Sequence, residues 1–96
     1  MQLDELKWLQ KWYLSNCNGE WEHAYGVEIG TLDNPGWTVK INLVGTDLQA
    51  KAFVEIKTQR SRNDWFVCWV KDQRFEVFGG PQNLSEIIGI FRRWAE

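Results

Sequence analysis

The chain has 96 residues, of which 44% are hydrophobic and 25% are charged, and its formal net charge is −2. This length suits one domain over residues 1–96 with a single core, and the composition excludes a disordered chain. No apolar run approaches the ~20 residues of a membrane-spanning helix, and the chain lacks the net positive charge typical of direct nucleic-acid binding.

The first predicted element is a helix from about Asp4 to Asn16. Its apolar residues recur at three- and four-residue spacing, and no Gly or Pro interrupts them. Acidic residues at its start suit the positive end of the helix dipole. Asn18 and Gly19 predict the end of the helix, because both tolerate left-handed backbone angles.

Alternating apolar residues then predict four or five strands joined by short connections. The expected strands cover residues 21–31, 37–43, 48–57, 64–71 and 74–78, with a polar connection over 58–63. Short connections favour an antiparallel meander. The strand over 64–71 is apolar on both faces, so it is either covered twice or exposes one face to a partner, which leaves a homodimer open.

The turn between the first two strands carries Asp33, Asn34, Pro35 and Gly36. Pro suits the second position of a type II turn and Gly suits the third, so we expect a structural turn that sets the strand register.

A second helix is predicted after Gly79-Gly80-Pro81, with Asn83 as its cap and Glu86 completing a capping-box pattern. Two amphipathic helices on one face of an antiparallel sheet form a two-layer α+β sandwich, which is the predicted fold class.

Tryptophan is unusually frequent, with seven residues in 96. One small core cannot hide all seven indoles, and exposed Trp is enriched at binding surfaces. Two interpretations remain open: core margin, or a binding surface for a partner or a small ligand such as a carbohydrate.

Residue types that commonly act in catalysis or bind metal ions are scarce in this chain. His23 is the only histidine, and Cys17 precedes the acidic Glu20 and Glu22, which disfavour a thiolate. Two isolated cysteines and one histidine match no structural zinc site. We therefore predict no catalytic set, no metal and no cofactor.

Location is inferred from the start of the chain and from its cysteines. Met1–Glu5 lacks the basic-then-apolar pattern of a signal peptide, so a cytoplasmic protein is expected. Cys17 and Cys68 are then expected to be reduced thiols.

Charge is divided unevenly along the chain. Residues 1–36 hold six acidic and two basic residues, a net charge of −4, whereas residues 37–96 hold seven acidic and nine basic residues, a net charge of +2. Such asymmetry is typical of a solvated surface or of an acidic patch that faces a basic partner.

Several motifs occur in a distinctive order along the chain: Leu6-x-Trp8-Leu9-x-x-Trp12-Tyr13, Trp21-Glu22-His23-x-Tyr25-Gly26, Asp33-Asn34-Pro35-Gly36-Trp37, Asn63-Asp64-Trp65, Gly79-Gly80-Pro81-x-Asn83-Leu84 and Ile90-Phe91-x-x-Trp94. Taken together, they resemble the immunity protein 53 family of bacterial polymorphic toxin systems. The similarity covers essentially the whole chain.

The resemblance implies a small cytoplasmic protein that binds a cognate toxin domain stoichiometrically and performs no chemistry itself. A nuclease is one candidate for the toxin, and the protein would be a monomer or homodimer. Aromatic anchors beside acids suit a basic cleft. The candidate partner-binding residues are Glu20, Trp21, Glu22, His23, Tyr25 and Trp37. In the alternative interpretation, Trp21 and Tyr25 belong to the core and Glu22 is a cap.

Overall fold

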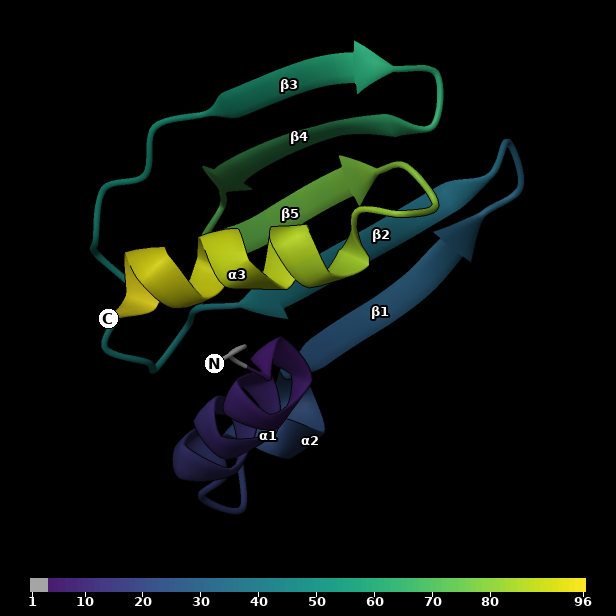
Figure 1. Ribbon diagram of the computed structural model, residues 1–96. Coiled ribbons are helices and arrows are strands. Elements are labelled where there is room, and N and C mark those ends of the chain that lie inside the picture. The colour runs from purple at the N-terminus through teal and green to yellow at the C-terminus, as the bar shows by residue number, and fades with distance from the viewer. Residues whose placement is uncertain (1–3) are drawn as a thin grey trace.

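Figure 1 shows the computed structural model of the protein, which describes residues 4–96. Residues 1–3, part of the segment assessed for an export signal, lie outside this range. The helices are α1 (Glu5–Asn16), α2 (Trp21–Ala24) and α3 (Leu84–Ala95). The strands are β1 (Val27–Leu32), β2 (Gly36–Asn42), β3 (Ile56–Ser61), β4 (Asp64–Lys71) and β5 (Arg74–Gly79).

The five strands form one antiparallel sheet in the order β1-β2-β5-β4-β3, so the predicted α+β class is confirmed. The sheet is not a simple meander. β1 and β2 form one hairpin unit, β3, β4 and β5 form a second, and β5 joins the two by pairing with β2. The chain between β2 and β3 therefore crosses from the middle of the sheet to its far edge.

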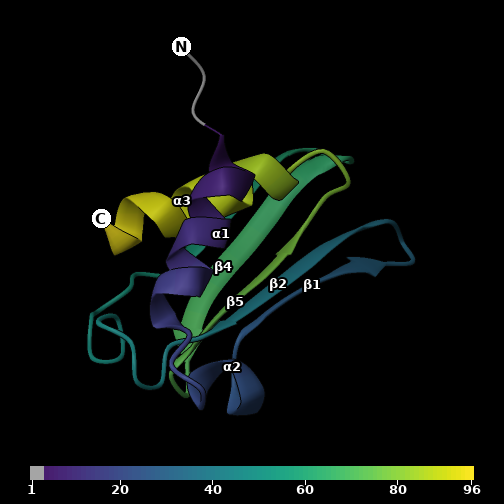
Figure 2. The same cartoon turned by 90° about the horizontal axis from the view of Figure 1, so that it is seen from below.

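Both long helices lie on the same side of the sheet, as predicted, and Figure 2 shows this two-layer arrangement. α3 packs across β5, and α1 packs against α3. The side chains between the layers are almost fully buried, with Phe75, Ile87 and Phe91 at 0% exposure. The core therefore centres on β2, β4, β5 and α3.

α1 is held at its start and along one side. The Asp4 carboxylate accepts a hydrogen bond from the Lys7 backbone N–H at 3.0 Å and caps the helix. Arg92 of α3 pairs with Glu5 of α1 at 3.0 Å, and both side chains are largely buried. The rings of Trp8 and Trp12 pack edge-on against Phe91.

The structure corrects two predicted strands. Residues 21–24 form the short helix α2, so the first strand begins at Val27 instead of Trp21. The strand expected over 48–57 is mostly a loop, and β3 instead occupies residues 56–61, of which only 56–57 were predicted as strand and 58–61 were predicted as part of a connection. β3 is a polar edge strand in which only Ile56 and Thr58 are partly buried, and it lacks the apolar alternation on which the prediction relied.

Two details of the predicted connections are also wrong. Gly36 has no positive φ and opens β2, so the type II turn does not form; a Cβ there would collide with the carbonyl oxygen of Gly79. Asn83 occupies the N-cap position of α3, as predicted, but its side chain makes no cap hydrogen bond. Its buried amide instead accepts from the Trp65 N–H and donates to Asp64, which ties β4 to the start of α3.

Candidate partner-binding site

The predicted site begins at a loop that local hydrogen bonds hold in place. Asn18 Oδ1 accepts hydrogen bonds from the backbone N–H groups of Glu20 and Trp21, at 2.9 and 3.0 Å. The Glu22 carboxylate accepts from the N–H groups of Asn18 and Gly19, at 2.8 and 2.7 Å. Glu22 therefore closes the loop that leads into α2.

These contacts keep Glu22 ionised. Hydrogen bonds from its own backbone N–H and from the amides of Asn18 and Gly19 lower the pKa of the Glu22 carboxyl. The carboxylate therefore stays negatively charged to a lower pH than an ordinary Glu side chain. It is also the cap that closes the loop. Its role in the loop does not remove its charge from the surface.

Trp21 is buried, with 4% of its surface exposed. Its ring packs edge-on against Trp12, with centroids 5.8 Å apart, and lies 5.7 Å from the ring of Tyr13. Its indole N–H has no hydrogen-bond acceptor within residues 4–96. Trp21 thus anchors α2 to α1, and a partner cannot reach its ring without a rearrangement.

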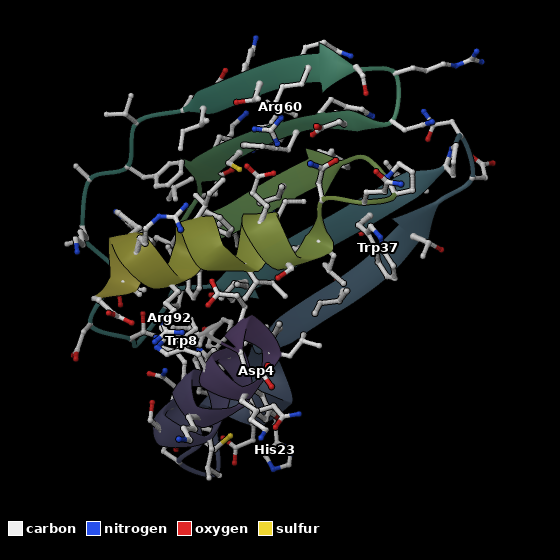
Figure 3. All side chains as sticks on the ribbon, viewed as in Figure 1. Asp4, Trp8, His23, Trp37, Arg60 and Arg92 are labelled. Carbon is white, nitrogen blue, oxygen red and sulfur yellow. The ribbon has the colours of Figure 1, made fainter. Side chains whose placement is uncertain are left out.

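The exposed members of the predicted set are Glu20, His23 and Tyr25, and Tyr25 is 47% exposed. Figure 3 places His23 on α2, while Trp37 lies at the other end of the β1–β2 hairpin. Trp37 is half-buried, and its indole N–H donates to the Pro81 carbonyl at 3.0 Å. The structure therefore brings Glu20, Glu22, His23 and Tyr25 together but separates Trp37 from them.

A hollow of about 310 Å³ lies beside this group, between α1 and the start of β1. Leu9 and Tyr13 of α1 contribute one side, and Tyr25 and Val27 contribute the other. Glu22 lies at its margin together with Gln10 and Gly26. The α1 residues were missed as site residues because their helical spacing looks the same whether the stripe is buried or partly open.

The segment of the chain that includes α2 and β1 is acidic in sequence. No Lys or Arg occurs between Lys11 and Lys40, whereas Glu20, Glu22, Glu28 and Asp33 all fall there. Glu20, Glu28 and Asp33 are exposed. We call α1, α2 and β1 together the N-terminal rim; its α2–β1 portion combines carboxylates with exposed aromatic and aliphatic side chains.

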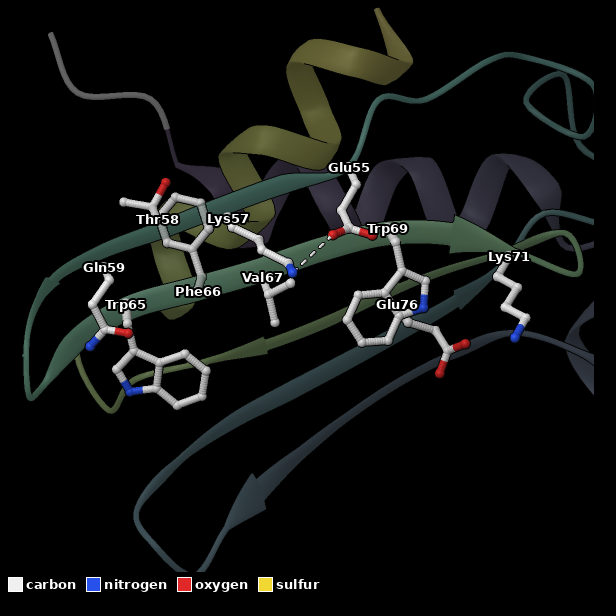
Figure 4. Close-up of a pocket in the computed structure, with 10 residues that line it drawn as sticks. All are labelled: Glu55, Lys57, Thr58, Gln59, Trp65, Phe66, Val67, Trp69, Lys71 and Glu76. Atoms are coloured by element: carbon white, nitrogen blue, oxygen red, sulfur yellow. Dashed lines mark ion pairs between the residues drawn. The ribbon is translucent and has the colours of Figure 1, made fainter.

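A second hollow lies on the face of the sheet opposite the helices. It measures about 910 Å³, and Figure 4 shows Trp65 and Trp69 among the side chains that line it. Both indoles are half-buried, and Trp69 packs against Phe78 with ring centroids 5.5 Å apart. The prediction that β4 is either covered twice or open on one face is resolved: its Trp65–Trp69 face is open.

Both cysteines are free thiols. Cys68 lies in the core, and burial raises the pKa of its thiol to about 12. Cys17 is partly exposed, and its thiol donates to the Tyr13 carbonyl at 3.2 Å. The described part of the chain holds no cluster of three metal-ligating side chains, and none of its helices is long and apolar enough to cross a bilayer.

Comparison with known protein families gives a match that spans nearly the whole chain. The model of immunity protein 53 matches residues 6–96. The chain belongs to the immunity protein 53 family. No curated protein and no solved structure matches the chain. Membership implies that the chain neutralises a cognate toxin, and immunity proteins are typically inhibitors without catalytic activity.

Both candidate surfaces lie within the part of the chain that the immunity protein 53 model covers. They differ in chemistry: the hollow of the N-terminal rim adjoins an acidic segment, whereas the open sheet face carries Lys57 and Lys71 as well as Glu55 and Glu76. The family match does not indicate which of the two surfaces binds a toxin. That choice depends on the charge and the side chains of each surface.

Proposed function

We propose that the chain neutralises its cognate toxin by forming a stoichiometric protein–protein complex that covers the toxin's active site. The complex forms in the cytoplasm of the bacterium that makes both proteins. The chain contributes shape and charge, and it catalyses no reaction. A specific complex of this kind buries on the order of 800 Å² on each partner.

One observation carries the choice of surface: the segment between Lys11 and Lys40 has no basic residue and displays acids beside an aromatic hollow. Glu20, which precedes α2, and Tyr25, which follows it, are exposed members of this segment. Desolvated aromatic anchors supply most of the affinity at interfaces, while surrounding charges raise the association rate. The surface therefore suits a toxin whose active-site cleft is basic.

A nuclease meets that description, because its cleft must attract phosphates. In such a complex the carboxylates of Glu20, Glu22 and Glu28 occupy positions that phosphates take in the substrate. Binding would then depend on salt, since charge pairs at an interface rim are screened by ions.

The experiment is co-expression with the toxin domain encoded beside the gene of this chain. Cells that make both proteins are expected to survive, and a complex of defined stoichiometry is expected in size-exclusion chromatography. Death of the cells at the rate seen with toxin alone, with no complex recovered, would contradict the proposal. The same chromatography of the free chain shows whether it is a monomer or a homodimer.

A second candidate function is favoured by the hollow on the open sheet face. Trp65 and Trp69 lie there beside Gln59 and Glu76, and indole platforms next to polar groups are typical of small-ligand and carbohydrate sites. Titration with an oligosaccharide panel tests this by indole fluorescence. A saturable change that Trp65→Ala abolishes would support ligand binding, and an unchanged spectrum across the panel would exclude it for those sugars.

A further inference from the structure

β1 forms one edge of the sheet and pairs only with β2. The Asn42 N–H donates to the Gly26 carbonyl at 3.0 Å, which fixes the phase of this antiparallel ladder. Hydrogen-bonded and non-hydrogen-bonded pairs alternate, so the backbone groups of Glu28 and Gly30 point toward β2. The backbone groups of the remaining residues point outward: Val27, Ile29 and Thr31.

The other edge of the sheet, β3, is protected in the ways that natural edge strands usually are. It carries the charged Lys57 and Arg60, and its pairing with β4 shifts register between Gln59 and Ser61. Charges and irregularities of this kind discourage the addition of another strand. β1 has an unbroken register, no proline and a single charge, Glu28, so it is the edge that remains open to pairing.

Side chains on the helix side of β1 are poorly covered. Ile29 is 41% exposed although its neighbour across the ladder, Val39, is buried. The 310 Å³ hollow beside Val27 and Tyr25 opens on this side. Apolar side chains of an added strand would bury Ile29 and find room there.

The opposite side of β1 carries Glu28 on the edge strand itself. A smaller hollow of about 180 Å³ lies here, lined by Glu28 and by Lys40 and Arg74 from the strands further in. Of these three charged side chains, Glu28 lies nearest to an added strand. Lys40 is one strand further from the edge, and Arg74 is two strands further. The nearest charge therefore favours basic side chains on this side.

We propose that β1 is the docking edge for an extended segment of the toxin, in which basic and apolar side chains alternate. The segment pairs with the outward backbone groups of Val27, Ile29 and Thr31. Its apolar side chains lie against Ile29, and its basic side chains lie beside Glu28. The inference rests on the proposed function and names the element and the kind of segment through which the complex forms.

Amide hydrogen exchange, resolved by residue, tests the pairing directly. The probe is the catalytically inactivated toxin domain encoded beside the gene of this chain, added to the full-length chain. Toxin binding is expected to slow exchange at Val27, Ile29 and Thr31 by roughly tenfold or more, with little change at Glu28 and Gly30. Uniform protection along β1, or none, in a complex that forms normally would overturn the proposal.

A proline substitution tests the same edge by affinity. Ile29→Pro removes an N–H that points away from β2, and edge strands tolerate proline at such positions. It is expected to weaken toxin binding at least roughly tenfold. Ile29→Thr, which keeps the N–H and the β-branched shape, is the matched control and is expected to bind more tightly than Ile29→Pro. Equal affinities of the two variants would contradict backbone pairing, provided that thermal unfolding shows both to be folded.

The charge of the segment is tested by reversing neighbouring charges across the ladder. Glu28→Lys is expected to weaken binding roughly tenfold, whereas Lys40→Glu is expected to preserve or strengthen it. The reverse pattern would show an acidic segment and overturn this part of the proposal. If the unmodified chain neither binds nor protects, the proposed function itself fails; if it binds and all β1 variants bind equally, only this inference fails.

Discussion

The molecule divides into a closely packed core and a thinly covered N-terminal rim. In the core, Phe75, Ile87 and Phe91 have no exposed surface. In the rim, Leu6 is 51% exposed and Leu14 is 71% exposed, although both lie on a helix that packs against the core. The rim therefore leaves apolar surface in water that the core does not.

The difference in apolar exposure indicates which part of the molecule is suited to binding a partner. Burial in the core is explained by stability alone, since each large side chain there contributes to the hydrophobic free energy of folding. Exposed apolar side chains contribute little to folding, and contiguous exposed apolar patches mark interaction sites. Core substitutions should change stability, and rim substitutions should change binding.

The largest expected effect is in the core. Phe91→Ala should lower the free energy of unfolding by about 3–5 kcal/mol, because it removes a ring that packs against Trp8, Trp12 and Phe75. Leu14→Ala on the rim should change it by less than about 0.5 kcal/mol. Urea denaturation measures both. If both variants lost a similar free energy of unfolding, the core and the rim would not differ in their contribution to stability.

A smaller loss is expected where the hairpin of the rim joins the core. Gly36→Ala places a Cβ against the carbonyl oxygen of Gly79, and backbone atoms cannot move aside cheaply. We expect a loss of about 2 kcal/mol in the free energy of unfolding, read from the thermal midpoint. Unchanged stability would mean that β2 and β5 can separate locally at Gly36. This end of the hairpin would then not belong to the closely packed core.

The smallest expected effect concerns the surface cluster that joins β3, β4 and α3. The Arg60 guanidinium and the Asn83 amide hold the pKa of the Asp64 carboxyl below its usual value. The ionised form is favoured by folding, so its stabilising contribution is present above pH about 4 and fades as the pH falls through the lowered pKa. Asp64→Asn should flatten the acid side of the stability profile, as measured by denaturation between pH 2 and pH 6. A profile as steep as that of the unmodified chain would assign the acid sensitivity to other carboxylates.

Much of the fold could be predicted because the core follows simple periodicity. The continuous apolar run within Asp64–Lys71 gives β4 with its observed bounds, and the helical apolar stripe after Asn83 gives α3. α2 could not be predicted, because its single turn depends on hydrogen bonds that nearby backbone amides donate to the side chains of Asn18 and Glu22. The strand order depends on β5 pairing with β2, a long-range contact that no local pattern encodes.

The sequence names part of the candidate site but not the roles of its residues. The motif around Trp21 and Tyr25 marks one segment of it, yet only packing shows that Trp21 is buried and Tyr25 is exposed. Glu22 could be read as a contact or as a cap, and it caps the Asn18–Gly19 amides. The open face of β4 was anticipated only as one of two alternatives, since a strand apolar on both faces does not reveal which face a helix covers.

The central claim is that the N-terminal rim binds the toxin, and a matched pair of charge reversals tests it most directly. Glu20→Lys and Glu55→Lys both reverse an exposed carboxylate, one on the rim and one beside β3 at the opposite edge of the sheet. At low salt, association of the toxin domain with Glu20→Lys should slow by roughly tenfold, while Glu55→Lys should associate at the unmodified rate. An unchanged rate for Glu20→Lys, or a slower rate for Glu55→Lys alone, would contradict the account.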